Sequence, residues 1–216
     1  MNNIMVYITA LFLPIFIYLL MYSFFNKLKK NVIKDLSGFE ISRRILDGNS
    51  LNSIYIVEVK GLLNDHYDAN QKVVRLSTDV FHGENIAAYS VAAFISSYAL
   101  LDRQNEVFLR IKKMLDPIAS LLMYLSYICL ILSIFISELF GIAFSFLLLV
   151  LLYEFLMIPL NLKARAVALA EMLKDSNLKQ YESDINKILN IYILSSIASL
   201  VFDLIALVDK LIKRDK

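Results

Sequence analysis

Apolar runs alternate with charged stretches along the 216 residues of the chain. Each run is about 30 to 33 Å long as a helix, enough to cross a hydrocarbon core of about 30 Å. The second and third runs are separated only by Ser137 and Glu138, which favours a tight transmembrane hairpin. The pattern therefore predicts about four transmembrane helices, at residues 4–25, 117–136, 139–160 and 188–208.

A polar stretch between the first and second runs has the pattern of a small folded domain. Ser37 followed by Glu40 is a capping box, which predicts a helix over 38–47. Short β-branched runs at 53–59 and 72–77 predict two strands joined by a loop. Residues 85–101 are rich in alanine and contain neither glycine nor proline, which predicts a buried helix. The fold class is a mostly α integral membrane protein with a small α+β domain between its first and second membrane helices.

This pattern divides the chain into five parts. We expect an N-terminal anchor at 1–25, a soluble domain at 26–115, a transmembrane hairpin at 116–160, a polar helical segment at 161–187, and a last membrane helix with a basic tail at 188–216. Thirteen of the 22 Lys and Arg residues lie in 26–115. Basic loops stay on the cytoplasmic side, so we expect a multi-pass protein of the cell membrane with its soluble domain in the cytoplasm.

Composition agrees with a membrane location and excludes other classes. Apolar residues make up 58% of the chain, too many for a chain solvated on all sides. The formal charge is +2, and no basic stretch interleaved with aromatic residues predicts a nucleic-acid partner. The single cysteine, Cys129, excludes a disulfide framework and a thiolate metal cluster.

Several stretches together resemble a known family. They read "SGFEISRRIL", "LLNDHYDANQKVVRLSTDVFHGENIAAYSVAA", "LMIPLNLKARAVALAEML" and "INKILNIYILSSIASL". With the order of apolar runs, they resemble the membrane-bound neutral zinc metallopeptidases of the YugP type, found mainly in bacteria. The resemblance implies a zincin-like domain with the zinc helix at 85–101. It also implies H-E-x-G-H after two alanines, a further glutamate ligand, and a zinc-bound water as nucleophile.

The chain departs from this pattern at the positions that carry the chemistry. Aligned without a gap after Ala93, the two histidine ligands fall on Phe94 and Tyr98, the general base falls on Ile95, and the third ligand falls on Asn161. Phenylalanine offers no lone pair, isoleucine accepts no proton, and an amide is a poor zinc ligand. We therefore expect neither a catalytic residue nor a metal ligand at these positions, and no cofactor, with zinc only if the chain is an active peptidase.

We interpret the chain as a pseudopeptidase that binds a membrane protein or a peptide. The candidate contact loop is "DHYD", residues Asp65, His66, Tyr67 and Asp68. One alternative is an active peptidase with non-standard ligands, in which Asp65, His66, Asp68 and Glu84 converge with Tyr98. Others are a hydrolase using Ser96 or Ser97 and a structural or transport role involving Glu154 and Asp203.

Overall fold

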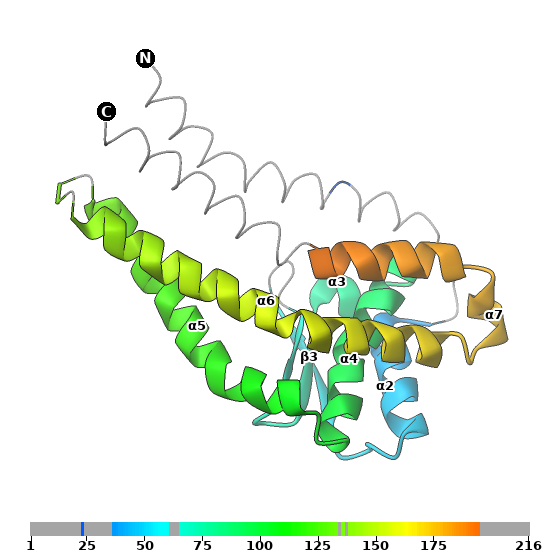
Figure 1. Ribbon diagram of the computed structural model, residues 1–216. Coiled ribbons are helices and arrows are strands. Elements are labelled where there is room, and N and C mark those ends of the chain that lie inside the picture. The colour runs from blue at the N-terminus through cyan, green and yellow to red at the C-terminus, as the bar shows by residue number, and fades with distance from the viewer. Residues whose placement is uncertain (1–22, 24–35, 61–64, 134, 137, 195–216) are drawn as a thin grey trace. The chain divides into compact units, whose positions relative to one another are not determined.

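The computed structural model describes residues 23, 36–60, 65–133, 135–136 and 138–194, and these are mostly helical with one small sheet (Figure 1). The predicted anchor at 4–25 lies outside the described residues except for residue 23. Asp203 and most of the predicted last membrane helix also lie outside them. Of the four predicted membrane helices, only the two central ones, at 117–136 and 139–160, can therefore be compared with the structure.

The chain divides into two compact units. One comprises residues 23–113 and 159–193, and the described part of the other comprises residues 114–158 and 194. We predicted the soluble domain at 26–115 and the polar segment at 161–187 as separate parts. In the structure the polar segment packs with the soluble domain, because its apolar side chains, such as those of Met172, Leu178 and Ile185, are buried there.

Helix α2 (Gly38–Gly48) confirms the predicted helix and its capping box. The Ser37 hydroxyl accepts the N–H of Glu40 at 3.3 Å, and the Glu40 carboxylate accepts the N–H of Ser37 at 2.5 Å. Two of the four backbone donors that a helix start leaves unpaired are thereby satisfied. The buried face of α2 packs against helix α4.

The sheet has three strands, β1 (Tyr55–Val59), β2 (His66–Asp68) and β3 (Val73–Ser77), in the order β1-β3-β2. β1 runs parallel to β3, and β2 runs antiparallel to it. The two predicted strands are confirmed, but the segment that we took as a loop contains β2. Its short polar sequence carries no hydrophobic alternation, so only pairing with β3 makes it a strand.

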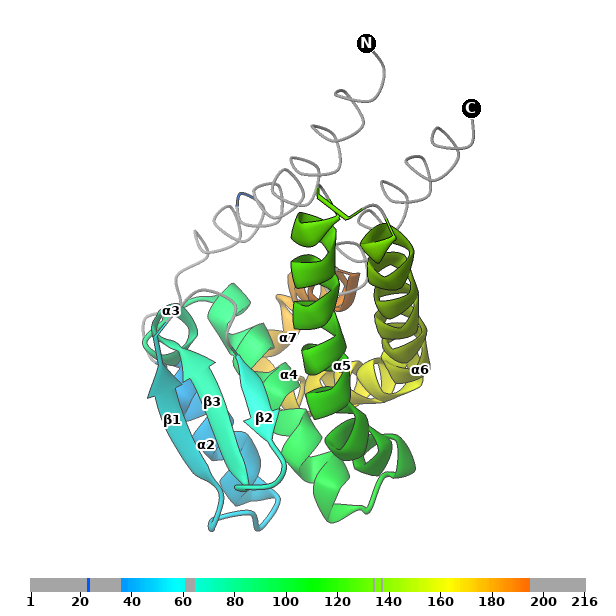
Figure 2. The same ribbon diagram turned by 90° about the vertical axis from the view of Figure 1, so that its left-hand side faces the viewer.

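Helix α4 (Ile86–Arg103) follows the short helix α3 (Thr78–Phe81) and confirms the predicted buried helix. Every residue from Ile86 to Leu101 is buried. The side chain of Asn85 caps the helix by accepting the N–H of Ala88 at 3.0 Å. α2 and α4 lie on the same face of the sheet (Figure 2), which makes α4 the central element of this unit.

Helices α5 (Val107–Leu132) and α6 (Leu139–Met172) confirm the predicted hairpin as two helices long and apolar enough to cross a membrane. Both are longer than their apolar runs. α6 continues through Pro159 and past residue 160, since a proline removes only one helical hydrogen bond and membrane helices tolerate it. The chain does not continue as one helix from α4 into α5, because it turns at Asn105, where φ is 55°.

Within the second unit, α5 and α6 share an apolar seam. Met123 and Leu130 of α5 pack against Phe140 and Leu147 of α6. Beyond the seam, large apolar side chains on both helices are exposed, as expected for helices surrounded by lipid. The remaining helical parts, helix α7 (Ser176–Lys179) and residues 182–194, belong to the first unit apart from residue 194.

Candidate functional site

The positions aligned with the family's chemistry come together in the first compact unit. Phe94, Ile95 and Tyr98 lie on α4 and are buried, and Asn161 lies on α6. The Tyr98 hydroxyl donates to Oδ1 of Asn161 at 2.7 Å, although the two residues are 63 positions apart in sequence. Two positions that the resemblance assigned to metal ligands therefore contact each other directly.

Phe94 makes ring contacts with two tyrosines, one of which is Tyr98. The rings of Phe94 and Tyr98, one helical turn apart, meet edge to face with centroids 5.3 Å apart and planes at 87°. The ring of Tyr192 also contacts that of Phe94, with centroids 5.3 Å apart and planes at 62°. Such T-shaped pairs stabilise by about 0.5–1.5 kcal/mol beyond the area that they bury. The Phe94 ring thus contacts two tyrosine rings.

Tyr192 is a residue that the sequence analysis missed. It lies in the apolar run that we predicted as the last membrane helix, and its hydroxyl donates to the backbone carbonyl of Asp65 at 3.4 Å. A tyrosine within an apolar run has a hydroxyl that needs a partner when it is buried. That requirement could have indicated that Tyr192 packs against a polar group, but the sequence alone does not identify the acceptor.

Asp65 is buried and engaged with β3. One of its carboxylate oxygens accepts the backbone N–H of Ser77 at 2.7 Å and the Ser77 hydroxyl at 3.0 Å. Burial raises the pKa of Asp65 above its usual value, and the hydrogen bonds from Ser77 oppose that shift only in part. This carboxylate joins the start of β2 to the end of β3.

The other residues of the "DHYD" segment have different roles. The Tyr67 hydroxyl donates to Oδ2 of Asp102 at 2.8 Å, and burial together with that carboxylate raises the pKa of Tyr67. Asp68 accepts the backbone N–H groups of Asn70 and Gln71, both at 3.0 Å. Of the four side chains, only that of His66 is classed as exposed.

The serines of α4 also have partners in the protein. Ser96 donates to the hydroxyl of Ser42 at 2.8 Å, and Ser97 donates to the carbonyl of Phe94 at 2.6 Å. A serine nucleophile needs a base within hydrogen-bond reach. Within the described part of the chain neither hydroxyl is hydrogen-bonded to a base, so the structure gives no support to a serine hydrolase.

Comparisons with known proteins identify the family. The profile of a family described as "Putative neutral zinc metallopeptidase" matches residues 3–214. A relative from Bacillus subtilis (strain 168), named "Putative membrane protease YugP", is 38% identical over 84 residues. That alignment covers 39% of this chain and 37% of the relative. No solved structure matches this chain. The chain belongs to this metallopeptidase family.

Membership corrects one expectation and confirms another. The resemblance to the YugP type is confirmed. The expectation that no cofactor is involved is wrong, because the family is described as one of zinc metallopeptidases and so points to zinc.

The residues at the aligned positions do not fit a zinc ion held by histidines and a carboxylate. Zinc takes imidazole, thiolate or carboxylate donors, whereas the polar groups here are a phenol and an amide that hydrogen-bond to each other. Across residues 36–60, 65–133 and 138–194, no three His, Cys, Asp or Glu side chains gather into a metal-binding group. Asp65, His66, Asp68 and Glu84 therefore do not converge with Tyr98, and we derive no step through zinc.

Proposed function

We propose that this member of the neutral zinc metallopeptidase family is a pseudopeptidase, a membrane protein that binds a peptide or a membrane-protein segment without cleaving it. The observation that carries the proposal is the hydrogen bond between Tyr98 and Asn161, together with the contacts of the Phe94 ring with the rings of Tyr98 and Tyr192. It supports a centre in which packing and a neutral hydrogen bond replace the groups that hydrolysis needs.

The proposal follows from the chemistry of each aligned position. Peptide hydrolysis needs a general base whose pKa lies near the working pH, and Ile95 at that position cannot accept a proton. A phenol is a poor base at neutral pH because it keeps its proton there, and the Tyr98 hydroxyl already donates to Asn161. The Phe94 ring cannot hold a water molecule in place for attack. None of these side chains activates a nucleophile.

The binding surface that we propose is strand β2. It stands at one end of the strand order, and no strand in the described part of the chain pairs with its other edge. An extended peptide can add to such an edge through main-chain hydrogen bonds. Phe94, Tyr98, Asn161 and Tyr192 form a connected set that we name the Phe94 group. Because the Asp65 carbonyl contacts Tyr192, the start of β2 lies beside this group. His66 is the exposed side chain that would contact the peptide.

The membrane arrangement that we propose has four transmembrane helices, at 4–25, 117–136, 139–160 and 188–208, and a cytoplasmic soluble domain. The two apolar helices α5 and α6 and the membrane protease named among the relatives support it. The basic residues of 26–115 support the cytoplasmic side. The client is then a bacterial membrane protein or a peptide that reaches this domain.

The test uses the full chain purified in detergent and a pool of unstructured peptides. Peptides that the protein retains, and peptides that it cleaves, are identified by mass spectrometry. We expect the native protein to retain peptides uncut and the His66→Ala variant to retain fewer. His82→Ala is the matched control, since His82 is also exposed and pairs with Glu58. Cleavage by the native protein, abolished by a chelator, would refute the proposal.

The second candidate is an active zinc peptidase with non-standard ligands, which the family description and the protease relative favour. It predicts stoichiometric zinc and peptide cleavage in the native protein. The variant with Phe94→His, Ile95→Glu, Tyr98→His and Asn161→Glu is the positive control for both readouts. Zinc content and peptide cleavage are measured for the native protein and for this variant. Zinc and cleavage in the native protein would indicate an active peptidase, and their absence there but presence in the variant would indicate a pseudopeptidase.

A further inference from the structure

A carboxylate held between two lysines adjoins strand β2 through the Tyr67 hydroxyl. The group comprises Tyr67 of β2, Lys72 from the turn before β3, Asp102 near the end of α4, and Lys113 of α5, and we name it the Asp102 cluster. We propose that the Asp102 cluster docks the phosphate headgroup of an anionic phospholipid. The proposal rests on the membrane location in the proposed function and is independent of peptide binding.

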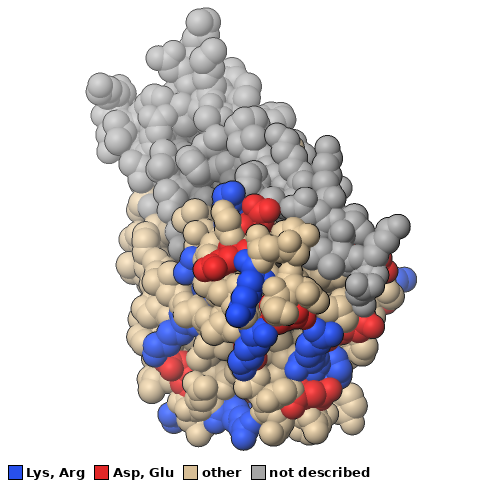
Figure 3. Space-filling view, turned by 90° about the vertical axis from the view of Figure 1, so that its right-hand side faces the viewer, with Lys and Arg blue, Asp and Glu red and all other residues tan. Residues whose placement is uncertain are grey.

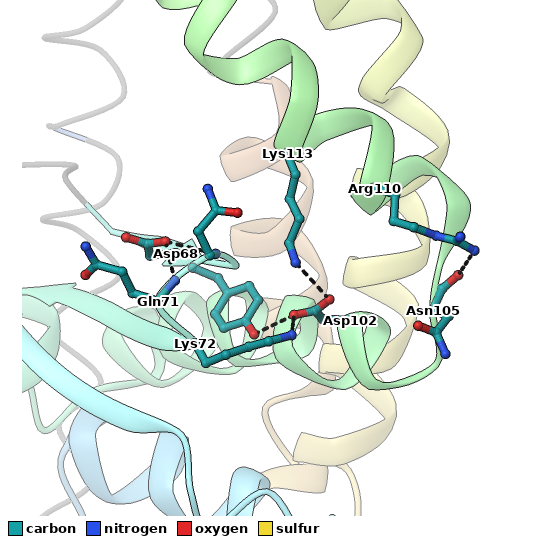
Figure 4. Close-up of polar contacts among 9 residues, drawn as sticks. Asp68, Gln71, Lys72, Asp102, Asn105, Arg110 and Lys113 are labelled. Atoms are coloured by element: carbon teal, nitrogen blue, oxygen red, sulfur yellow. Dashed lines mark hydrogen bonds and ion pairs between the residues drawn. The ribbon is translucent and has the colours of Figure 1, made fainter.

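The two lysines reach the same carboxylate from different elements. Lys72 Nζ contacts Oδ2 of Asp102, and Lys113 Nζ lies 3.5 Å from Oδ1 (Figure 4). The Tyr67 hydroxyl also donates to Oδ2. One negative charge therefore holds two positive charges together, which leaves the cluster positive. A phosphate bridging the two ammonium groups would supply the missing negative charge.

The Asp102 carboxylate is largely buried, whereas the Lys72 ammonium group is accessible to a ligand. The Asp102 side chain is 10% exposed and that of Lys72 is 54% exposed. An ammonium group has three N–H donors, and the described contacts of Lys72 occupy one of them. Lys72 adopts a positive φ of 58°, which costs a residue with a side chain some energy and is more frequent at functional sites.

The position of Lys113 along α5 points to a membrane surface. The next residue, Met114, is exposed, and the exposed apolar residues Ile118, Leu121 and Tyr124 follow on the same helix. If α5 spans the bilayer, a cation immediately before its lipid-exposed stretch lies at the depth of the headgroups. Arg110, which points away from the cluster toward Asn105 (Figure 4), adds a second cation at that level.

The charge distribution on another face of the molecule differs from that of the Asp102 cluster. In the view of Figure 3, Lys and Arg side chains alternate with Asp and Glu side chains over the described surface. Alternating charges produce little net field and favour no anionic surface. An acidic peptide would match the charge of the Asp102 cluster as well as a lipid does, but it would have no reason to prefer the end of an apolar helix.

The test measures lipid binding to the full chain in detergent by native mass spectrometry. Phosphatidylglycerol is titrated in parallel with phosphatidylcholine, and glycerol 3-phosphate provides the same headgroup chemistry without acyl chains. We expect tighter binding of phosphatidylglycerol than of phosphatidylcholine, and no adduct with glycerol 3-phosphate at equal concentration. The triple variant Lys72→Gln, Asp102→Asn, Lys113→Gln should bind phosphatidylglycerol more weakly by roughly fivefold per lysine removed.

The triple variant avoids leaving a buried carboxylate without partners, and its melting temperature verifies folding. The control variant Lys174→Gln, Lys187→Gln removes two exposed lysines that pair with Glu171 and Asp184, and it should bind lipid as the native chain does. The single variant Asp102→Asn tests whether the placement of the two lysines matters or only their charge. It makes the cluster more positive but removes the carboxylate that holds both lysines in place. Weaker lipid binding by Asp102→Asn supports the cluster. Equal binding of both lipids, an unchanged triple variant, or displacement of the lipid by an acidic peptide would overturn the proposal.

Discussion

Helices α4 and α5 are both apolar, yet they differ in what surrounds them. α4 is buried along its whole length from Ile86 to Leu101 within the first compact unit. α5 has large side chains exposed along its length, with Tyr124 exposed by 70%. The side chains explain the difference. α4 is rich in alanine and serine, which allow other elements to approach closely, whereas α5 has leucine, isoleucine and tyrosine, whose size suits contact with lipid chains.

The comparison teaches that apolar character alone does not separate a core helix from a membrane helix. Two features distinguish them better: the size of the side chains, and whether polar side chains form hydrogen bonds inside the protein. Ser90, Ser96 and Ser97 of α4 all donate hydrogen bonds inside the protein. Most exposed residues of α5 from Met114 onward, such as Ile118, Leu121 and Ile128, have aliphatic side chains that need no hydrogen-bond partner.

The largest expected difference is in access to lipid. A membrane-soluble diazirine probe, activated by light in native membranes, should label α5 and α6 heavily at exposed residues such as Tyr124 and Phe155. The fully buried α4 should be almost unlabelled. Peptide mapping by mass spectrometry measures the label on each helix. Equal labelling of α4 would contradict the assignment of α4 to a protein core.

The next expected effect concerns packing density. Ala92 of α4 is fully buried, so Ala92→Leu should destabilise the protein by about 1–3 kcal/mol through overpacking. Gly141 of α6 is the matched site, because no atom lies within 4 Å of an added Cβ. Gly141→Leu should leave the melting temperature in detergent unchanged or raise it. A larger loss of stability from Gly141→Leu than from Ala92→Leu would contradict the closer packing of α4.

Polar pairs give a smaller contrast. Tyr98→Phe removes the hydrogen bond to Asn161, and we expect a loss of about 0.5–1.5 kcal/mol. Tyr153→Phe removes the contact with Asp116 in the other unit, and we expect about 0.6 kcal/mol, the average for polar contacts between membrane helices. A double-mutant cycle with Asn161→Ala measures the first coupling directly. A coupling near zero would mean that the pair contributes nothing to packing of α4 against α6.

The smallest effect is a pH dependence from Asp65. Its pKa is raised by burial, so the folded state holds this proton more tightly than the unfolded chain does. The free energy of unfolding should therefore decrease as pH rises from the usual value of 3.8 through the raised folded pKa. Asp65→Asn should remove that slope. Thermal unfolding across the acid range tests this, and an identical slope in the variant would assign it to another group.

The sequence by itself determined the elements whose signals are local. The capping box at Ser37, the alanine-rich helix at 85–101 and the two long apolar helices α5 and α6 follow from neighbouring residues, so their predictions agree with the structure. The alignment that paired Phe94, Tyr98 and Asn161 came from the resemblance. It stays a prediction, although the structure brings these three side chains to one place.

Only the tertiary structure decided features that depend on partners distant in sequence. β2 is a strand because β3 pairs with it, and Tyr192 belongs to the Phe94 group because residues 182–194 pack in the same unit as α4. Lys72 and Lys113 meet on Asp102 although 30 and 11 positions separate them from it. Such contacts carry no local pattern, since their free energy is gained only when the chain has brought both partners together.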